Sequence, residues 1–239
     1  MSAVEAMTSG ESQQPAGVNT MPSELATRIR GCTACDSLPL SAAVTVRPFI
    51  KPCSEFDIYT SWKPEHVSLV FIAEAPPGNS DGYFYDPRSH PGYREILRTA
   101  LFDLLRLEGT DNAARLATFK ARGYVLIDAV KCRCKKTGPQ PPGSVTKTCA
   151  TKWLKRELEE MGSPKRICLL GKTALLALSE VDGFDQLSRY SVTSHCGQTC
   201  VVGRQKVLIW PFPSKRNAHI YRTKLDSLRE FCRAGVQTI

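Results

Sequence analysis

Short apolar runs alternate with segments whose apolar residues recur at helical spacing. Four runs have the length and aliphatic composition of buried strands, at 67–73, 124–130, 166–170 and 205–210. Helical spacing covers 23–29, 91–107, 144–161, 172–179 and 220–233. Alternation of this kind predicts an α/β fold in which helical crossovers join parallel strands. A site is then expected in the loops that follow the carboxyl ends of the strands.

The first 21 residues differ from the rest of the chain. They are rich in Ser, Gln, Gly and Thr and poor in large apolar side chains, so they cannot bury enough surface to offset the entropy of ordering. We expect a disordered tail at 1–21 and one folded domain at 22–239, because no internal repeat and no long linker divides the remainder.

The charge of the chain changes this picture by suggesting a partner. The formal net charge is +9, and the first 21 residues hold two glutamates and no Lys or Arg, so the remainder carries about +11 (32 minus 21). Such a field attracts polyanions, although many basic proteins bind nothing acidic. Basic residues cluster at Lys131, Arg133, Lys135 and Lys136, and again at Lys215 and Arg216.

Cysteine content and the lack of a long apolar stretch bear on location and chemistry. No stretch approaches the roughly 18–20 apolar residues of a membrane helix, and Glu5 stands where a secretory signal carries basic residues. We therefore expect a cytoplasmic protein without a membrane partner. Ten cysteines in such a chain argue against a disulfide framework and favour metal ligation, although most could be buried thiols.

The loop after the first predicted strand carries a carboxylate and several aromatic side chains. Glu74 is followed by Ala75 and Pro76, and then by three consecutive aromatics at 83–85. A carboxylate at the mouth of a sheet beside aromatic rings could hold a flat heterocycle and a water molecule. A solvated glutamate and a tight turn packed by its aromatics would produce the same pattern.

The second and third loops add a carboxylate and two cations. Asp128 interrupts an apolar run, and an ionised carboxylate inside a sheet is costly unless it is paired or functional, although it could merely cap a loop. The loop at 210–219 has two prolines and then Lys215 and Arg216 at a helix start, where backbone N–H groups suit a phosphate. An ordinary exposed basic turn is the alternative for this loop.

Two cysteine pairs supply four possible thiolate ligands. Cys32 and Cys35 form a Cys-x-x-Cys motif, and Cys132 is followed by Cys149 after sixteen residues. Four thiolates suit either a cubane iron–sulfur cluster or a structural zinc ion. One tight pair plus one wide pair favours iron–sulfur over zinc, and Cys134 could compete for a ligand position.

Taken in order, these motifs resemble the iron–sulfur branch of the uracil-DNA glycosylase superfamily over residues 24–233, as an atypical member. That branch has a Cys-x-x-Cys after an N-terminal helix, a Gly-Glu-Ala-Pro-Gly motif, and a strand ending in Asn-x-Val-Lys-Cys with a further Cys about fifteen residues on. Here these motifs correspond to Cys32 and Cys35, to 73–77, to 128–132, and to Cys149. The resemblance implies a three-layer α/β/α fold around a small, mostly parallel sheet, and a structural 4Fe–4S cluster, with zinc as the second choice.

The resemblance also assigns roles to the site residues. It implies that the protein flips uracil out of DNA, holds it by stacking and edge hydrogen bonds, and hydrolyses its glycosidic bond. Glu74 takes the motif carboxylate position and Asp128 replaces the usual uracil-reading Asn. We expect Asp128 to activate water or stabilise the sugar cation, with Glu74 as a close rival. The implied uracil pocket comprises Ala75, Pro76, Phe84, Tyr85 and Asp128.

The third loop departs furthest from the family. Its usual His-x-Ser is Phe212-Pro213-Ser214 here, so the histidine that stabilises the departing base is absent. The segment Ser214, Lys215, Arg216 and Asn217 corresponds to residues that insert into DNA.

Three other functions remain open. They are a non-turnover protein that binds uracil or abasic sites, a zinc-stabilised nucleic-acid module, and a glycosylase for another deaminated base. Under the preferred reading the partner is DNA, single- or double-stranded, there is no small-molecule cofactor, and the protein is a monomer.

Overall fold

The computed structural model describes residues 23–38, 45–48, 58–77, 82–88, 96–135 and 141–234. The expected tail at 1–21 and the first part of the helix expected at 91–107 lie outside these ranges.

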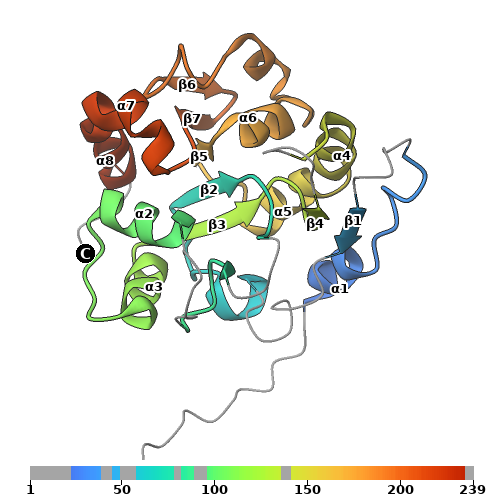
Figure 1. The fold of residues 1–239 in the computed structure, drawn as a ribbon, viewed down its shortest axis with the longest axis horizontal. Helices are drawn as coiled ribbons and strands as arrows, with labels where there is room; N and C mark the ends of the chain where they lie inside the picture. The colour runs from blue at the N-terminus through green and yellow to red at the C-terminus, as the bar shows by residue number, and fades with distance from the viewer. Residues whose placement is uncertain are drawn as a thin grey trace, which may run out of the picture.

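A five-stranded sheet forms the centre of the molecule (Figure 1). Its strands lie in the order β3-β2-β5-β7-β6, and each of the first four is parallel to its neighbour. The fifth, β6, pairs antiparallel with β7. The bounds are β2 Leu69–Ala73, β3 Tyr124–Asp128, β5 Arg166–Leu170, β6 Thr199–Val202 and β7 Gln205–Trp210. The expectation of a small, mostly parallel sheet is confirmed.

Helices cover both faces of the sheet, which gives three layers. Alternate residues of a strand point to opposite faces, so Leu69 and Phe71 of β2 pack in one core while Val70 and Ile72 pack in the other. The first core is closed by α2 (Ile96–Leu105), α3 (Asn112–Ala121), α7 (Ala218–Tyr221) and α8 (Leu225–Arg233). The second is closed by η3 (Ala150–Leu154), α5 (Lys155–Glu160), α6 (Lys172–Ser179) and η4 (Asp185–Arg189).

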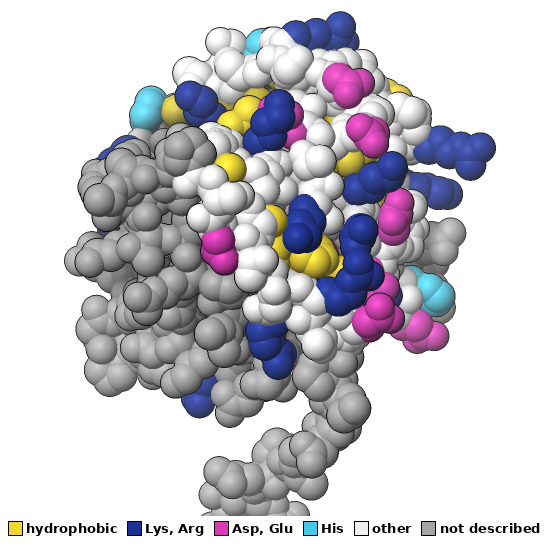
Figure 2. All heavy atoms as spheres, turned by 90° about the vertical axis from the view of Figure 1, so that its right-hand side faces the viewer, with side chains coloured by type: hydrophobic (Ala, Val, Ile, Leu, Met, Phe, Trp, Pro, Cys, Tyr) yellow, Lys and Arg dark blue, Asp and Glu magenta, His cyan; other side chains and the backbone are white. Residues whose placement is uncertain are grey.

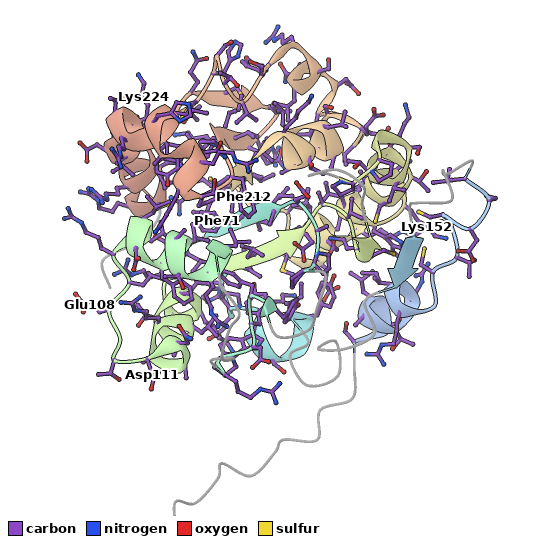
Figure 3. All side chains as sticks on the ribbon, viewed as in Figure 1. Phe71, Glu108, Asp111, Lys152, Phe212 and Lys224 are labelled. Atoms are coloured by element: carbon purple, nitrogen blue, oxygen red, sulfur yellow. The ribbon has the colours of Figure 1, made fainter. Side chains whose placement is uncertain are left out.

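Two helices begin at side-chain caps that the sequence supplies. Ser23 Oγ accepts a hydrogen bond of 3.1 Å from the amide of Ala26 at the start of α1 (Glu24–Arg30). Asp111 does the same for Ala114 at 2.8 Å, and it lies at the start of α3 (Figure 3). Each cap satisfies an amide that the helix leaves without a partner in its first turn.

The long helix expected at 144–161 is present as three consecutive segments. They are α4 (Gly143–Cys149), the π-helical η3, and α5, which together run from Gly143 to Glu160. A third core lies between this stretch and α1, and it contains the cysteines discussed below.

Several elements were not expected from the sequence. They are α3, the edge strand β6, and a short antiparallel pair formed by β1 (Thr45–Pro48) and β4 (Cys132–Lys135). Short helical turns also occur at η1 (Ile58–Trp62), η5 (Lys215–Asn217) and η6 (Arg222–Lys224). In the described part of the chain, no helix has the length and apolar character needed to span a membrane.

Candidate functional site

The loops after the four parallel strands open at one edge of the sheet, and two of them meet where the winding reverses. Because β3 lies on one side of β2 and β5 on the other, the reversal falls between β2 and β5. Open α/β sheets bind ligands at such a point, outside the carboxyl ends of the strands. Glu74 directly follows β2, and Thr173 in the first turn of α6 donates a hydrogen bond of 3.3 Å to its Oε2.

Asp128 is the last residue of β3 and lies beside the end of β2. It stands opposite Ala73 in the strand register. The pairing continues beyond the strands, since the amide of Ala129 donates to the carbonyl of Ala73 at 2.8 Å and that of Val130 to the carbonyl of Glu74 at 3.0 Å. The structure therefore brings the two predicted catalytic carboxylates to adjacent strand ends.

The surroundings of Asp128 shift its proton affinity. Burial raises the pKa of this carboxyl from 3.8 to about 7, Lys131 opposes the rise, and the carboxylates of Glu157 and Glu74 add to it. Asp128 remains half-buried, so water can reach it. A carboxyl group with a pKa near neutrality is suited to take up and release protons at physiological pH.

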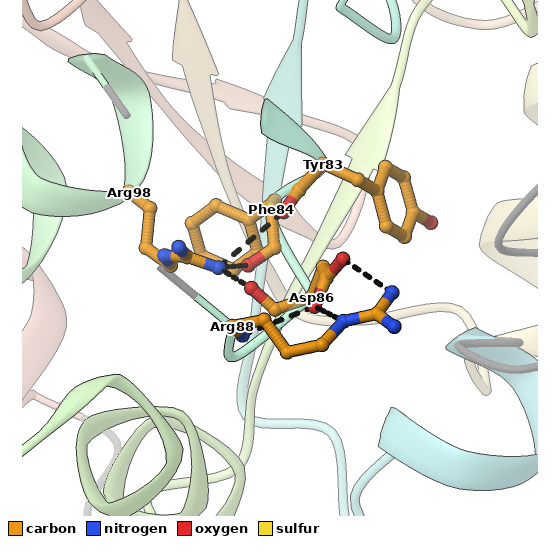
Figure 4. Close-up of polar contacts among 5 residues, drawn as sticks. All are labelled: Tyr83, Phe84, Asp86, Arg88 and Arg98. Atoms are coloured by element: carbon orange, nitrogen blue, oxygen red, sulfur yellow. Dashed lines mark hydrogen bonds and ion pairs between the residues drawn. The ribbon is translucent and has the colours of Figure 1, made fainter. Parts of the chain in front are cut away.

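The loop that carries the aromatic residues 83–85 is held in place by a buried arginine. Arg98 of α2 donates to the backbone carbonyls of Tyr83 at 3.4 Å and Phe84 at 3.3 Å, and also to that of Asp86 (Figure 4). The side chain of Asp86 accepts two 2.8 Å hydrogen bonds from the guanidinium of Arg88. These contacts hold the turn in one shape.

The rings of this loop pack into the core that contains α2 and α3. Phe84 makes edge contacts with Tyr85, Phe102 and Phe119 at centroid distances of 5.0, 5.7 and 5.3 Å. Tyr85 stacks on Trp62 at a centroid distance of 5.6 Å, and Tyr85 is buried while Trp62 is half-buried. The predicted stacking of a base on Phe84 or Tyr85 stays a prediction. Ala75 is half-buried against the third core and Pro76 is buried.

The loop after β7 packs closely against the start of α6. Gly171 has a φ of 100°, and a Cβ there would lie 3.3 Å from the Cβ of Phe212. A glycine is therefore needed at this point both for its backbone conformation and for the approach of Phe212. Phe212, which replaces the family's histidine, lies half-buried in this contact (Figure 3).

The four predicted DNA-binding residues fall into two kinds. Ser214 Oγ accepts from the amide of Asn217 at 3.4 Å, and Asn217 Nδ2 donates to the carbonyl of Phe212 at 2.9 Å, so these two side chains hold the loop together. Lys215 and Arg216 are exposed, and no ion pair involving either occurs among the described residues. These two cations can reach a phosphate.

The four predicted cysteine ligands belong to one apolar cluster. Cys132 and Cys149 are buried in the third core, and Cys32 and Cys35 pack against it. Two sulfurs accept hydrogen bonds, Cys149 from the amide of Lys131 at 3.1 Å and Cys32 from Trp153 Nε1 at 3.3 Å. The structure thus gathers side chains from the turn after α1, from β4 and from α4.

Burial changes the proton affinity of two thiols in this cluster, Cys149 and Cys35. Burial raises the pKa of Cys149 to about 12, and it also raises the pKa of Cys35, with Cys32 adding to that rise. Lys152, which lies on the side of the molecule that carries α1 (Figure 3), lowers the pKa of Cys35 by a smaller amount. In the described ranges, no three His, Cys, Asp or Glu side chains form a group that could hold a metal ion. The side chain of Cys134 lies outside what is described.

Lys131 requires a correction, because it was counted among the clustered basic residues that were expected to attract a polyanion. It is 8% exposed, forms an ion pair with Glu157 and donates to the carbonyl of Asp128. Glu157 in turn accepts from the hydroxyl of Tyr59. Glu157 was not predicted from the sequence, although it falls four residues after Trp153 on the buried side of its helix, where an apolar residue is expected.

Charge on the face that carries α1 and α4 is mixed. Figure 2 shows Lys and Arg side chains interspersed with Asp and Glu there. Lys147 pairs with Glu180 at 2.9 Å and Lys155 with Asp182 at 3.7 Å. These pairs neutralise part of the positive charge, so the exposed cations beside the strand ends are the better candidates for a polyanion.

Comparison with known proteins agrees with this geometry. No significant match is found among curated proteins. The family model described as Uracil DNA glycosylase superfamily matches residues 61–234, which include every loop of the candidate site. The match leaves out Cys32 and Cys35, so it does not distinguish the iron–sulfur branch from the others. The fold, the strand-end carboxylates and the extent of this match together establish that the chain belongs to the uracil-DNA glycosylase superfamily.

Proposed function

We propose that the protein excises uracil from DNA by hydrolysing its N-glycosidic bond, leaving an abasic site. Family membership supports a DNA glycosylase in general, and uracil is the more specific part of the proposal. The observation that carries it is the pair of carboxylates at adjacent strand ends, Glu74 and Asp128, together with the near-neutral pKa of Asp128.

In the proposed reaction the glycosidic bond breaks as water attacks the sugar. The electron pair of the C1′–N1 bond leaves with uracil, and C1′ acquires positive charge. An ionised Asp128 stabilises that charge and takes a proton from the water molecule whose oxygen bonds to C1′. Glu74, which is oriented by the hydroxyl of Thr173, adds a second negative group on the same side of the sugar as Asp128.

The proposal gives the loop after β7 a role in binding. Lys215 and Arg216 are exposed at the start of a helical turn, where they can contact phosphates on either side of the extruded nucleotide. Asn217 and Ser214 support these contacts by fixing the loop. The duplex loses a few kcal/mol of stacking and pairing when the base is extruded, which such contacts help to offset.

We also propose that Cys32, Cys35, Cys132 and Cys149 hold a 4Fe–4S cluster with a structural role. Their shared apolar core and the N–H donors to two of the sulfurs fit a buried cluster. A structural zinc ion held by the same four thiolates is our second choice. A bound cluster would tie α1 to the core. Iron and zinc analysis of the purified protein, with its visible absorbance, decides between the two.

One observation favours a second function. Phe212 cannot donate a hydrogen bond to a departing base, so a relative that recognises uracil or an abasic site without turning over is the alternative.

The deciding experiment is a time course on oligonucleotides that carry one uracil, in single and double strands, with alkali to reveal abasic sites. Matched thymine oligonucleotides serve as the control. Multiple turnovers on uracil alone would support the proposal. A tight complex without cleavage would favour the binding function, and cleavage only of an oligonucleotide with another deaminated base would replace uracil in the proposal.

A further inference from the structure

A buried ion pair lies directly beneath the candidate site. The side chains of Lys131 and Glu157 are 7% and 1% exposed. Two charges removed from water in this way lose much of their hydration, and a buried pair often stabilises a fold no better than apolar side chains would. The location of the pair is therefore more informative than its contribution to stability.

Lys131 connects the pair to Asp128. Its ammonium group donates to the backbone carbonyl of Asp128 as well as to Glu157. The carbonyl belongs to the peptide that leads out of β3, so this hydrogen bond helps to fix the orientation of the residue whose carboxylate faces the site. The amides of Ala129 and Val130 fix the same turn from the side of β2.

Lys131 is also fastened to the helical segment that carries Cys149. Its amide donates to Cys149 Sγ at 3.1 Å, while its side chain reaches Glu157 about two turns further along. Tyr59 of η1 holds Glu157 from the opposite side by donating to its second carboxylate oxygen. Three elements therefore meet at this ion pair: the turn after β3, the helical segment 143–160, and η1.

We propose that Lys131 and Glu157 are positioning residues that hold Asp128 in its reactive orientation and tie that orientation to the helix bearing Cys149. The inference rests on the proposed function for its catalytic part. Neither residue touches substrate in this account; they act through the backbone of Asp128. A displacement of about 1 Å at a reacting group can cost roughly 100-fold in rate, so loss of the network is expected to slow the chemical step without weakening DNA binding.

The test removes both charges together, because loss of one would leave the other buried alone. Lys131→Met with Glu157→Met keeps the side-chain lengths and a neutral interior. Lys147→Met with Glu180→Met is the matched control, since it removes a partly exposed ion pair that joins Lys147 of the same helical segment to Glu180 at the end of α6. Single-turnover excision, DNA affinity and the thermal unfolding midpoint are measured for both variants and the unaltered protein.

We expect the buried double variant to lose about 10- to 100-fold in single-turnover rate, with DNA affinity within about twofold and the unfolding midpoint near that of the unaltered protein. The control should change none of the three. A wild-type rate, or a loss of affinity that accounts for the loss of rate, would overturn the proposal.

Hydrogen exchange of the Ala129 and Val130 amides gives a readout that needs no activity. Exchange at these two amides should become faster in the buried double variant and stay unchanged in the control, because their partners are the strand-end carbonyls next to Asp128. Unchanged exchange would overturn the positioning role even if excision slows. If the unaltered protein cleaves no damaged oligonucleotide, the proposed function fails, and this exchange result alone decides the positioning role.

Discussion

The loops after β3 and β7 both carry basic residues in the sequence, and the structure uses them in opposite ways. Lys131 after β3 is buried against Glu157, whereas Lys215 after β7 is exposed to solvent. Lys131 holds the turn that contains Asp128, and Lys215 is available to bind an external anion. A basic residue near a site therefore serves binding or architecture according to whether the fold supplies an acidic partner. Four predictions test this division.

The largest effect is expected from the carboxylate that the buried cation supports. Asp128→Asn should reduce single-turnover excision by about 100-fold or more, since it removes the group that takes the proton from water. DNA affinity should change little. Equal losses of rate and affinity would assign Asp128 to binding instead.

Removing Lys131 alone should be strongly destabilising. Lys131→Met leaves Glu157 buried without its partner, and the expected loss in free energy of unfolding is about 3–5 kcal/mol. Lys215→Met should change the free energy of unfolding by less than about 0.5 kcal/mol, because that side chain is exposed. Denaturant unfolding of the two variants measures the difference, and similar losses would contradict the division between the loops.

The titration of Asp128 should change activity and stability in opposite directions as the pH rises. Its pKa is about 7 in the folded protein and 3.8 ordinarily, so excision should rise about tenfold per pH unit below 7 and level off above it. The stability that this group contributes is present below about pH 4 and is lost as the pH rises through 7.

Asp128→Asn should abolish both pH effects and raise the free energy of unfolding at pH 8 by about 1–3 kcal/mol. Unfolding and single-turnover rates measured from pH 5 to 9 test this. A flat rate profile for the unaltered protein would exclude Asp128 as the titrating group.

The smallest effect is expected at the exposed loop. Lys215→Ala with Arg216→Ala should make the negative slope of log affinity against log salt shallower by roughly 1.5–2 units, because each lost phosphate contact removes a little under one unit. The single-turnover rate at saturating protein should remain near wild type. An unchanged slope would remove this loop from the DNA interface.

Much of the site could be predicted from the sequence because parallel strands end at the same edge. The continuous apolar run of β2 predicted a strand, and Glu74 and Asp128 were expected at the same edge of the sheet. The pairing of Cys132 with Cys149 was predicted from the order and spacing of the cysteine motifs and from the family resemblance. The inferences about the strands need only local pattern and chain order.

Features that depend on distant partners could not be predicted in this way. The burial of Lys131 depends on Glu157, which lies far along the chain, and nothing in the residues around Lys131 signals it. The helix α3 presents only Leu116 and Phe119 to the core, too few for a clear periodic signal. The edge strand β6 is mostly exposed, so it lacks the apolar run that revealed the inner strands.

The hydroxyl of Tyr85 has a consequence for how this protein behaves at high concentration. It donates to the carbonyl of Leu126 at 2.8 Å and accepts from the amide of the same residue at 2.7 Å, so one side chain occupies the outer edge of β3. An open strand edge invites pairing with another chain, and here that edge is blocked at its centre. Self-association through strand addition is thereby directed to the opposite edge of the sheet, at β6, where Val201 is 64% exposed.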